Sequence, residues 1–360
     1  MSERLISADS HVKMTHDQVK SHLSPKFHDD YDEASGAYEA RMSRGTGAAN
    51  RAGAAKVAAS HSVFSRPGYW DPVERLKDMD ADGVEKEVLY SEVSAFRYLS
   101  DVKSGIGETV RAFNDTLYEF SLVDPARLIV SYQIPIHDVH LAVAEVKRVV
   151  DLGAKSLQLP VFPNELGLPE YFDDRYVPLL RTIEESGLPV CCHIGLKTTL
   201  EDVARRDPTP NMGVMVPMTP LMTAEAFGMW IMGGVFERFP ELKVVFVEPG
   251  LAWVAWWLEM VDDMVNRQGY EYPAISELPS HYFHRNIFLT FVDEHLGLQR
   301  TRDLLGVGNI LWSTDFPHPV TSWPNSKQIV ADQFEGIPAD ERELILSGNA
   351  LRVWNLESTH

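Results

Sequence analysis

The residues best suited to chemistry in this sequence are two histidines and two aspartates that stand at the ends of short apolar runs. Asp9 and His11 end the first run, His193 ends a later one and Asp315 ends the last. Asp9 and His11 are two positions apart, so in extended backbone both side chains point to one face and can reach the same ion. Two imidazoles and two carboxylates suit Zn²⁺, Fe²⁺ or Mn²⁺ and leave room for a water or a substrate oxygen. We therefore predict one divalent metal ion held by these four residues, with zinc as the first choice.

Two further titratable residues accompany this set. Glu248 ends another apolar run, where a carboxylate can act as a general base, orient a water or reach the metal as an additional ligand. His318 lies three residues after Asp315 in the segment FPHP, whose prolines stiffen the loop. We interpret His318 as a proton-transfer or substrate-binding group, and a histidine that caps the loop is the alternative. The predicted catalytic residues are Asp315, Glu248 and His318.

Three residues are predicted to bind the substrate. Arg97 and His137 follow the second and third apolar runs, and the guanidinium fork of Arg97 can bind a carboxylate through two hydrogen bonds. Trp253 could offer apolar surface to a ring-bearing substrate. Aromatic residues at helical spacing, as at Trp253, Trp256 and Trp257, are more typical of a core or a subunit interface.

The elements that position these residues alternate along the chain. Eight short runs rich in apolar and β-branched residues read as parallel strands: Leu5-Ile6, Val84–Tyr90, Leu128–Tyr132, Lys155–Leu159, Pro189–His193, Lys243–Glu248, Asn286–Phe291 and Asn309–Asp315. Helical segments separate them, one opened by Asp71-Pro72 and one by Asp138. This alternation predicts an α/β fold, a distorted (β/α)8 TIM barrel that forms a single domain over residues 1–360. The active site of such a barrel lies at the C-terminal ends of the strands, where the candidate residues stand.

Two long insertions interrupt the pattern. Residues from about Met14 to Tyr69 precede the first barrel helix, and their middle is rich in Gly, Ala, Ser and Arg. We interpret the stretch 14–69 as a mobile lid or an oligomer contact, not as a separate domain. The stretch 196–225 is a second long loop on the same face, and its methionines and prolines indicate an adaptable apolar wall.

Composition and charge exclude several classes of protein. Of the 360 residues, 44% are hydrophobic and 24% charged, as in ordinary globular proteins. The net charge of −19 opposes non-specific binding to nucleic acid or anionic membranes, yet a bound metal would still admit a small anionic substrate. Cys191 and Cys192 are adjacent, which excludes a disulfide framework, and no run has the length of a membrane span. We expect a cytoplasmic protein that binds a small molecule and neither nucleic acid nor membrane.

Several motifs resemble the amidohydrolase superfamily, in particular its amidohydrolase-2 branch, which includes aminocarboxymuconate-semialdehyde decarboxylase and the resorcylate-type decarboxylases. The motifs cover nearly the whole chain: ISADSHV at 6–12, PVCCHIG at 189–195, LKVVFVEPGLAWV at 242–254, LWSTDFPHP at 311–319 and GNALRVW at 348–354. The resemblance implies that Asp9, His11, His193 and Asp315 bind the metal and that Asp315 also hydrogen-bonds a metal-bound water. It further implies a homo-oligomer, with the Trp- and Met-rich segments 251–264 and 221–232 as the expected interface.

This chain departs from the branch at two positions, and these departures determine the predicted reaction. Its decarboxylases usually carry His or Glu where Asp9 stands, and a catalytic His where this chain has Glu248. We therefore predict a hydrolase, in which a metal-activated water attacks a carbonyl while Asp315, Glu248 or His318 moves its proton. Non-oxidative decarboxylation of an aromatic or enoic acid is the alternative. A non-haem iron oxygenase is a second alternative if the ion is Fe²⁺, and a non-catalytic barrel is the remaining one.

Overall fold

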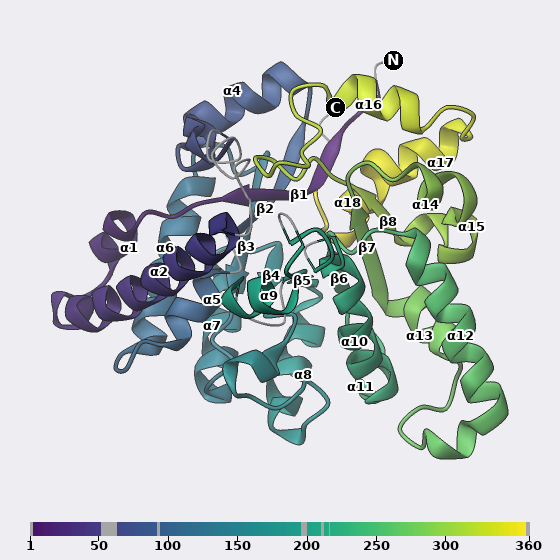
Figure 1. Cartoon of the computed structure of the whole chain (residues 1–360), viewed down its shortest axis with the longest axis horizontal. Coiled ribbons are helices and arrows are strands. Elements are labelled where there is room, and N and C mark those ends of the chain that lie inside the picture. The colour runs from purple at the N-terminus through teal and green to yellow at the C-terminus, as the bar shows by residue number, and fades with distance from the viewer. Residues whose placement is uncertain are drawn as a thin grey trace.

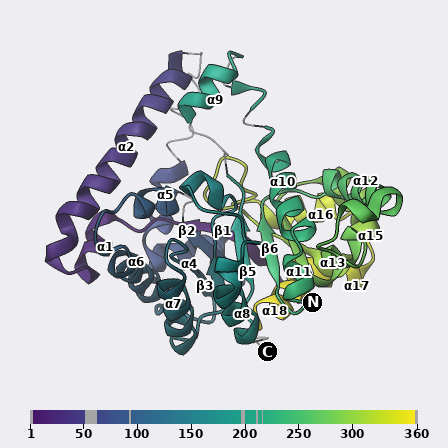
Figure 2. The ribbon, with the colours of Figure 1, turned by 90° about the horizontal axis from the view of Figure 1, so that it is seen from below.

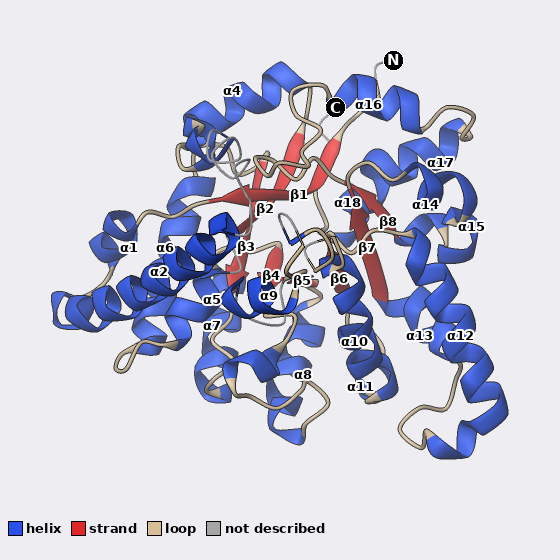
Figure 3. Ribbon diagram, viewed as in Figure 1, coloured by secondary structure: helices blue, strands red, loops and turns tan. Residues whose placement is uncertain are grey.

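The computed structural model describes residues 3–51, 63–91, 94–195, 200–209, 212–215 and 217–357. Eight parallel strands lie side by side in the order β1 to β8, and helices surround them (Figure 3). The strands are β1 Ile6–Val12, β2 Lys86–Ser91, β3 Leu128–Gln133, β4 Ser156–Gln158, β5 Val190–His193, β6 Val244–Val247, β7 Ile287–Phe291 and β8 Ile310–Trp312. The predicted (β/α)8 barrel is therefore confirmed.

The ring closes through the segment that follows β8. The Asp315 N–H donates to the carbonyl of Asp9 at 2.9 Å, and the His11 N–H donates to the carbonyl of Phe316 at 2.6 Å. β8 itself is shorter than predicted and ends at Trp312, and Asp315, with a φ of +52°, lies outside the extended region. β6 ends at Val247, because the φ of the next residue, Glu248, is +66° and leaves the extended region.

Helices cover the outside of the ring (Figure 1). In chain order they are α1 His16–His22, α2 His28–Arg51, α4 Pro72–Asp82, α5 Ser94–Ser100, α6 Ile106–Ser121, α7 Val139–Asp151, α8 Val177–Ser186, α9 Leu200–Arg206, α10 Thr219–Met232, α11 Val235–Arg238, α12 Ala252–Gln268, α13 Pro279–Asn286, α14 His295–Arg300, α15 Arg302–Leu305, α16 Ser326–Gln333, α17 Ala339–Glu343 and α18 Asn349–Val353. The predicted helix starts at Asp71 and Asp138 are confirmed, because each carboxylate accepts two backbone N–H bonds of its own first turn.

The barrel interior and the helical shell are packed separately. One cluster takes a buried side chain from every strand except β4 and includes Ile6, Ala8, Val245 and Val247. We assign it to the interior of the barrel, where Ser156 of β4 contacts Cys191. A larger apolar cluster fills the space between the strands and the helices. Among the described residues, the helices are too short or too polar for any of them to cross a bilayer.

The insertion after β1 is mainly helical in its described part. α1 packs on α6, and the long α2 contacts α5 and α9. Figure 2 shows α2 rising away from the barrel to meet α9, which belongs to the second long loop. The two insertions thus form an arch above the C-terminal ends of the strands. Residues 52–62 of the first insertion and 196–199, 210–211 and 216 of the second lie outside the described residues.

Candidate metal centre

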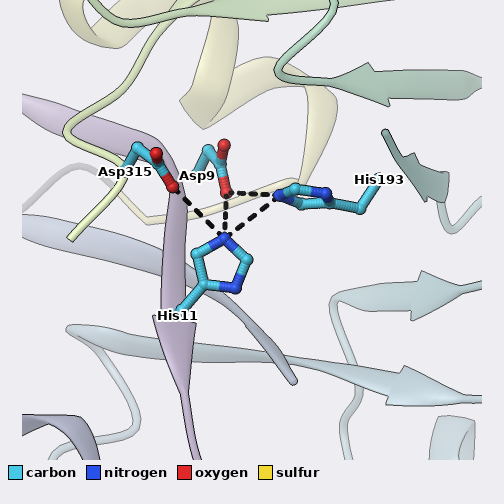
Figure 4. A group of neighbouring side chains, drawn as sticks. All are labelled: Asp9, His11, His193 and Asp315. Atoms are coloured by element: carbon cyan, nitrogen blue, oxygen red, sulfur yellow. Dashed lines mark hydrogen bonds and ion pairs between the residues drawn. The ribbon is translucent and has the colours of Figure 1, made fainter. Parts of the chain in front are cut away.

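The structure brings the four predicted ligands together (Figure 4). Asp9 and His11 come from β1, His193 ends β5, and Asp315 follows β8. The Nε2 atom of His11 is 3.1 Å from His193 Nε2 and 3.2 Å from Asp315 Oδ1. Oδ1 of Asp9 lies 3.7 Å from His11 Nε2 and 3.6 Å from His193 Nε2. Each of the four residues can therefore offer one atom to a shared ion.

A β-bulge aims the two ligands of β1 at this point. Ile6 and Ala8 face the barrel interior, so strict alternation would turn Asp9 and His11 outward. The pairing of β1 with β2 shifts between Ser7 and Ser10, which inserts an extra residue into the strand. A bulge reverses the alternation beyond it, and as a result Asp9 and His11 point inward.

The buried charges of the cluster fit a cation. Asp9 is fully buried, and its carboxylate oxygens accept no hydrogen bond from the described residues. A buried carboxylate without donors is unstable unless positive charge lies next to it. Nδ1 of His193 is 2.9 Å from the carbonyl of Ile194; as a donor there, it leaves the Nε2 lone pair for an ion.

The pKa values of the cluster reflect a competition between burial, which disfavours charge, and the neighbouring charges and hydrogen bonds, which stabilise it. Burial lowers the pKa of His193, but the carboxylates of Asp9 and Glu248 outweigh it and raise this pKa to about 9. Burial raises the pKa of Asp315, but hydrogen bonds from His11 and His318 outweigh burial and lower this pKa to about 2. The carboxylates therefore favour positive charge on the imidazoles, and a divalent ion would supply that charge instead.

Glu248 and His318 complete the centre on one side. His318 Nδ1 is 2.8 Å from Asp315 Oδ1, and its ring lies 3.9 Å from that of His11. Glu248 Oε2 is 3.8 Å from His193 Nε2. The backbone N–H of Glu248 donates to Thr290 Oγ1 at 2.7 Å. Burial, and next the charge of Asp315, raise the pKa of Glu248 to about 8. The structure thus places all three predicted catalytic residues at the metal centre.

The predicted substrate-binding residues lie at different distances from it. Arg97 forms an ion pair with Glu165 at 3.1 Å, and both line a small hollow of about 30 Å³ next to His193. His137 lines a separate hollow of about 10 Å³, and burial lowers the pKa of its imidazole. Trp253 donates from Nε1 to the carbonyl of Pro249 and stacks on Phe227 in the helical shell. Arg97 therefore lies next to the metal centre, His137 lies in a separate hollow, and Trp253 packs within the helical shell.

A buried arginine behind the ligands escaped the sequence analysis. Arg75 Nε donates to Glu87 Oε2 at 2.5 Å, and its Nη1 donates to the carbonyl of His11 at 2.9 Å. Glu87 also accepts from Ser10 Oγ at 3.2 Å. Arg75 precedes the buried Met79 by four residues and so shares the buried face of α4, a signal that could have revealed it.

Comparisons with known proteins find relatives over most of the chain. The model of the amidohydrolase family matches residues 11–356. The gamma-resorcylate decarboxylase of Polaromonas sp. is 27% identical over 306 residues, which cover 78% of this chain and 86% of that protein. The 2-amino-3-carboxymuconate-6-semialdehyde decarboxylase of Dictyostelium discoideum is 23% identical over 292 residues, 80% of this chain and 77% of that protein.

Solved structures share the fold. The 5-carboxyvanillate decarboxylase of Sphingomonas paucimobilis superimposes with a TM-score of 0.73 at 22% identity, over 99% of this chain and 100% of that one. A dihydroxybenzoic acid decarboxylase of Polaromonas sp., with bound manganese and 2-nitroresorcinol, gives a TM-score of 0.70 at 19% identity over 99% and 98%.

These relatives overturn the prediction of hydrolysis. The two curated relatives named above are decarboxylases, and so are the two solved structures. The sequence predicts hydrolysis because Glu248 stands where the branch carries a catalytic histidine. That reasoning was wrong because a carboxyl group can also deliver a proton, so its presence does not select a water nucleophile. The oxygenase alternative gains no support from these relatives.

Proposed function

We propose that this chain, which belongs to the amidohydrolase family, is a divalent-metal-dependent decarboxylase that removes the carboxylate of an aromatic or enoic acid without oxidation. The observation that carries the proposal is the buried cluster of two histidines and two aspartates, with Glu248 and His318 on the same edge of the barrel. The activities named for the curated relatives support this choice of reaction.

The proposed metal ligands are Asp9, His11, His193 and Asp315. An ion held by them would anchor the substrate through oxygen and stabilise the negative charge that develops on the substrate as CO₂ leaves. Mixed nitrogen and oxygen donors accept Mn²⁺ as well as Zn²⁺. We propose Mn²⁺ as the first ion to test, because two of the solved relatives bind manganese, and zinc remains the prediction from the sequence.

Decarboxylation needs a proton at the carbon that loses CO₂. The carboxylate leaves as CO₂, the bonding electrons stay on the carbon, and a proton adds there, so the reaction requires no oxidant. We assign proton delivery to Glu248, whose carboxyl lies beside His193 on the open side of the cluster. His318, anchored to Asp315 through Nδ1, then orients the substrate or restores the proton.

Isotope incorporation tests the proposal directly. Manganese-loaded protein is incubated in D₂O with a panel of hydroxybenzoates and carboxyvanillates, and CO₂ release and product mass are measured. We expect CO₂ in equal amount to product, with one deuterium on the vacated carbon. Protein stripped by a chelator serves as the control and recovers activity when Mn²⁺ is returned. Consumption of an acid without CO₂ release, or no CO₂ from any acid in the panel, would overturn the proposal.

A further inference from the structure

Three buried hydroxyl groups meet between β1 and the segment that follows β8. They belong to Ser7 and Ser10 of β1 and to Thr314, which precedes the proposed ligand Asp315. The Oγ atoms of Ser7 and Ser10 are 3.1 Å apart. Thr314 Oγ1 lies 3.1 Å from the Oγ of Ser7 and 2.9 Å from that of Ser10. We call these three residues the hydroxyl cluster.

The bulge of β1 brings Ser7 and Ser10 together. Residues three apart in a regular strand lie about 10 Å from each other and point to opposite faces. The pairing with β2 shifts between these two serines, and their hydroxyl groups are in contact. The hydroxyl cluster therefore spans the irregularity that turns Asp9 and His11 inward.

Ser7 connects the backbones of two proposed ligands. The backbone N–H of Thr314 donates to Ser7 Oγ at 2.9 Å, and Ser7 Oγ donates to the carbonyl of Asp9 at 2.7 Å. The same carbonyl accepts the N–H of Asp315 at 2.9 Å. The Ser7 hydroxyl thus bridges the residue before Asp315 to the backbone of Asp9. Its removal would take away both a donor and an acceptor that buried backbone groups use.

The protons of the hydroxyl cluster can be assigned because each hydroxyl group has only one. The proton of Ser7 goes to the carbonyl described above, and Ser10 Oγ donates to Glu87 Oε1 at 3.2 Å. The proton of Thr314 is left for Ser7 or Ser10, and Ser10 is the nearer acceptor. A hydroxyl group that donates to a carboxylate is polarised and accepts more strongly. The bonds therefore run from Thr314 through Ser10 to Glu87, whose charge is balanced by Arg75.

We infer that Ser7, Ser10 and Thr314 are positioning residues of the metal centre, and that their hydroxyl groups hold Asp9 and Asp315 at the spacing that one ion requires. The inference rests on the proposed metal-dependent decarboxylase and concerns the ligand geometry of that site. Two buried carboxylates repel each other, so hydrogen bonds that keep their backbones together raise the affinity of the site for a cation.

Manganese binding to Ser7→Ala tests the bridge without turnover. The affinity of the full chain for Mn²⁺ is measured by competition with a chelator, and we expect it to fall about tenfold or more. The electron paramagnetic resonance spectrum of bound Mn²⁺ should change as well, because the ligands are displaced. Ser131→Ala is the matched control, since Ser131 is equally buried and accepts from Ser156 Oγ at 2.9 Å in the barrel interior. It should lower the melting temperature of the metal-free protein, as Ser7→Ala does, and leave the affinity and the spectrum unchanged.

A second series removes and restores one hydroxyl group at Thr314. Thr314→Val keeps the shape of the side chain and should weaken Mn²⁺ binding about tenfold, whereas Thr314→Ser keeps the hydroxyl group and should bind Mn²⁺ as the wild type does. Thr109→Val is the matched control, because Thr109 is also buried and donates to the carbonyl of Gly105 at 2.9 Å on α6. We expect it to leave Mn²⁺ affinity unchanged. This series decides the question if Ser7→Ala does not fold.

Three results would overturn the inference: wild-type Mn²⁺ affinity in Ser7→Ala or Thr314→Val, an equal loss of affinity in the matched controls, or a Thr314→Ser variant that binds as weakly as Thr314→Val. These measurements are independent of the reaction. Variants that weaken Mn²⁺ binding as expected, in a chain that releases no CO₂, refute the decarboxylase alone. An active decarboxylase whose variants all keep wild-type Mn²⁺ affinity refutes the positioning role alone.

Discussion

Removal of the buried Arg75 guanidinium should destabilise the barrel and weaken metal binding together. Arg75 is 0% exposed and Glu87 is 3% exposed, so Arg75→Met leaves an uncompensated buried carboxylate. Breaking a buried ion pair in this way costs about 3–5 kcal/mol, a large share of the stability of a typical domain. The variant also removes the donor to the carbonyl of His11. Loss of such support around a metal ligand lowers affinity by about tenfold or more.

A double-mutant cycle shows whether the pair acts as described. Arg75→Met/Glu87→Leu removes both charges and should recover much of the stability lost in Arg75→Met, since no lone charge remains buried. Unfolding is followed by circular dichroism, and Mn²⁺ affinity by competition with a chelator. Arg148→Met is the control, because Arg148 of α7 pairs with Glu145 of the same helix and with Asp115 of α6 and is 22% exposed. Additive losses in the double variant, or a loss of metal affinity in Arg148→Met equal to that in Arg75→Met, would refute the reasoning.

Four other outcomes can be measured on the same protein. His193→Ala should abolish turnover and leave less than one metal per chain by elemental analysis; a full complement of metal would contradict its role as a ligand. Glu248→Gln should keep the metal and lower turnover by about 10²-fold, because the proton donor is lost, and loss of metal would instead make Glu248 a ligand. Limited proteolysis should cut first within 14–69, near its Gly- and Ala-rich middle, and cleavage elsewhere with resistance there would mean a packed segment. Trp256, which is 64% exposed on α12, lies in the predicted interface of the predicted homo-oligomer. Trp256→Glu should therefore lower the mass to that of a monomer in light scattering, and the same mass for both proteins would exclude α12.

The fold could be predicted because its signals are local and repeated. Each strand is a short apolar run, and Asp71 and Asp138 have the side chain and spacing of helix N-caps. The grouping of Asp9, His11, His193 and Asp315 followed from one property of the fold, that parallel strands present their C-terminal ends at one edge. No pairwise distance had to be known for that step.

The substrate side could not be predicted in the same way, because it depends on how separate elements pack. A cavity of about 370 Å³ has walls from β1, β2, the insertion, α5 and α6, and nothing local in the sequence brings Phe64 of its wall next to His318. His137 and Trp253 follow strand ends and so seemed placed to meet the substrate. Their side chains instead lie in a separate hollow and in the helical shell. A position after a strand fixes where the backbone emerges, but it leaves the direction of the side chain open.

The directions of the site residues arise from departures from regular strands. Val245 and Val247 face the barrel interior, so a further extended residue at 248 would point outward. The positive φ of Glu248 reverses that direction, and its N–H is held by Thr290 Oγ1. Asp315 also has a positive φ and is held by the carbonyl of Asp9, while the bulge of β1 turns Asp9 and His11 inward. Non-glycine residues in such conformations are strained and persist only where their surroundings fix them. Within the site, the strain thus lies at two acidic residues, Glu248 and Asp315, whose irregular backbone turns them toward the centre, and periodicity in the sequence cannot reveal such positions.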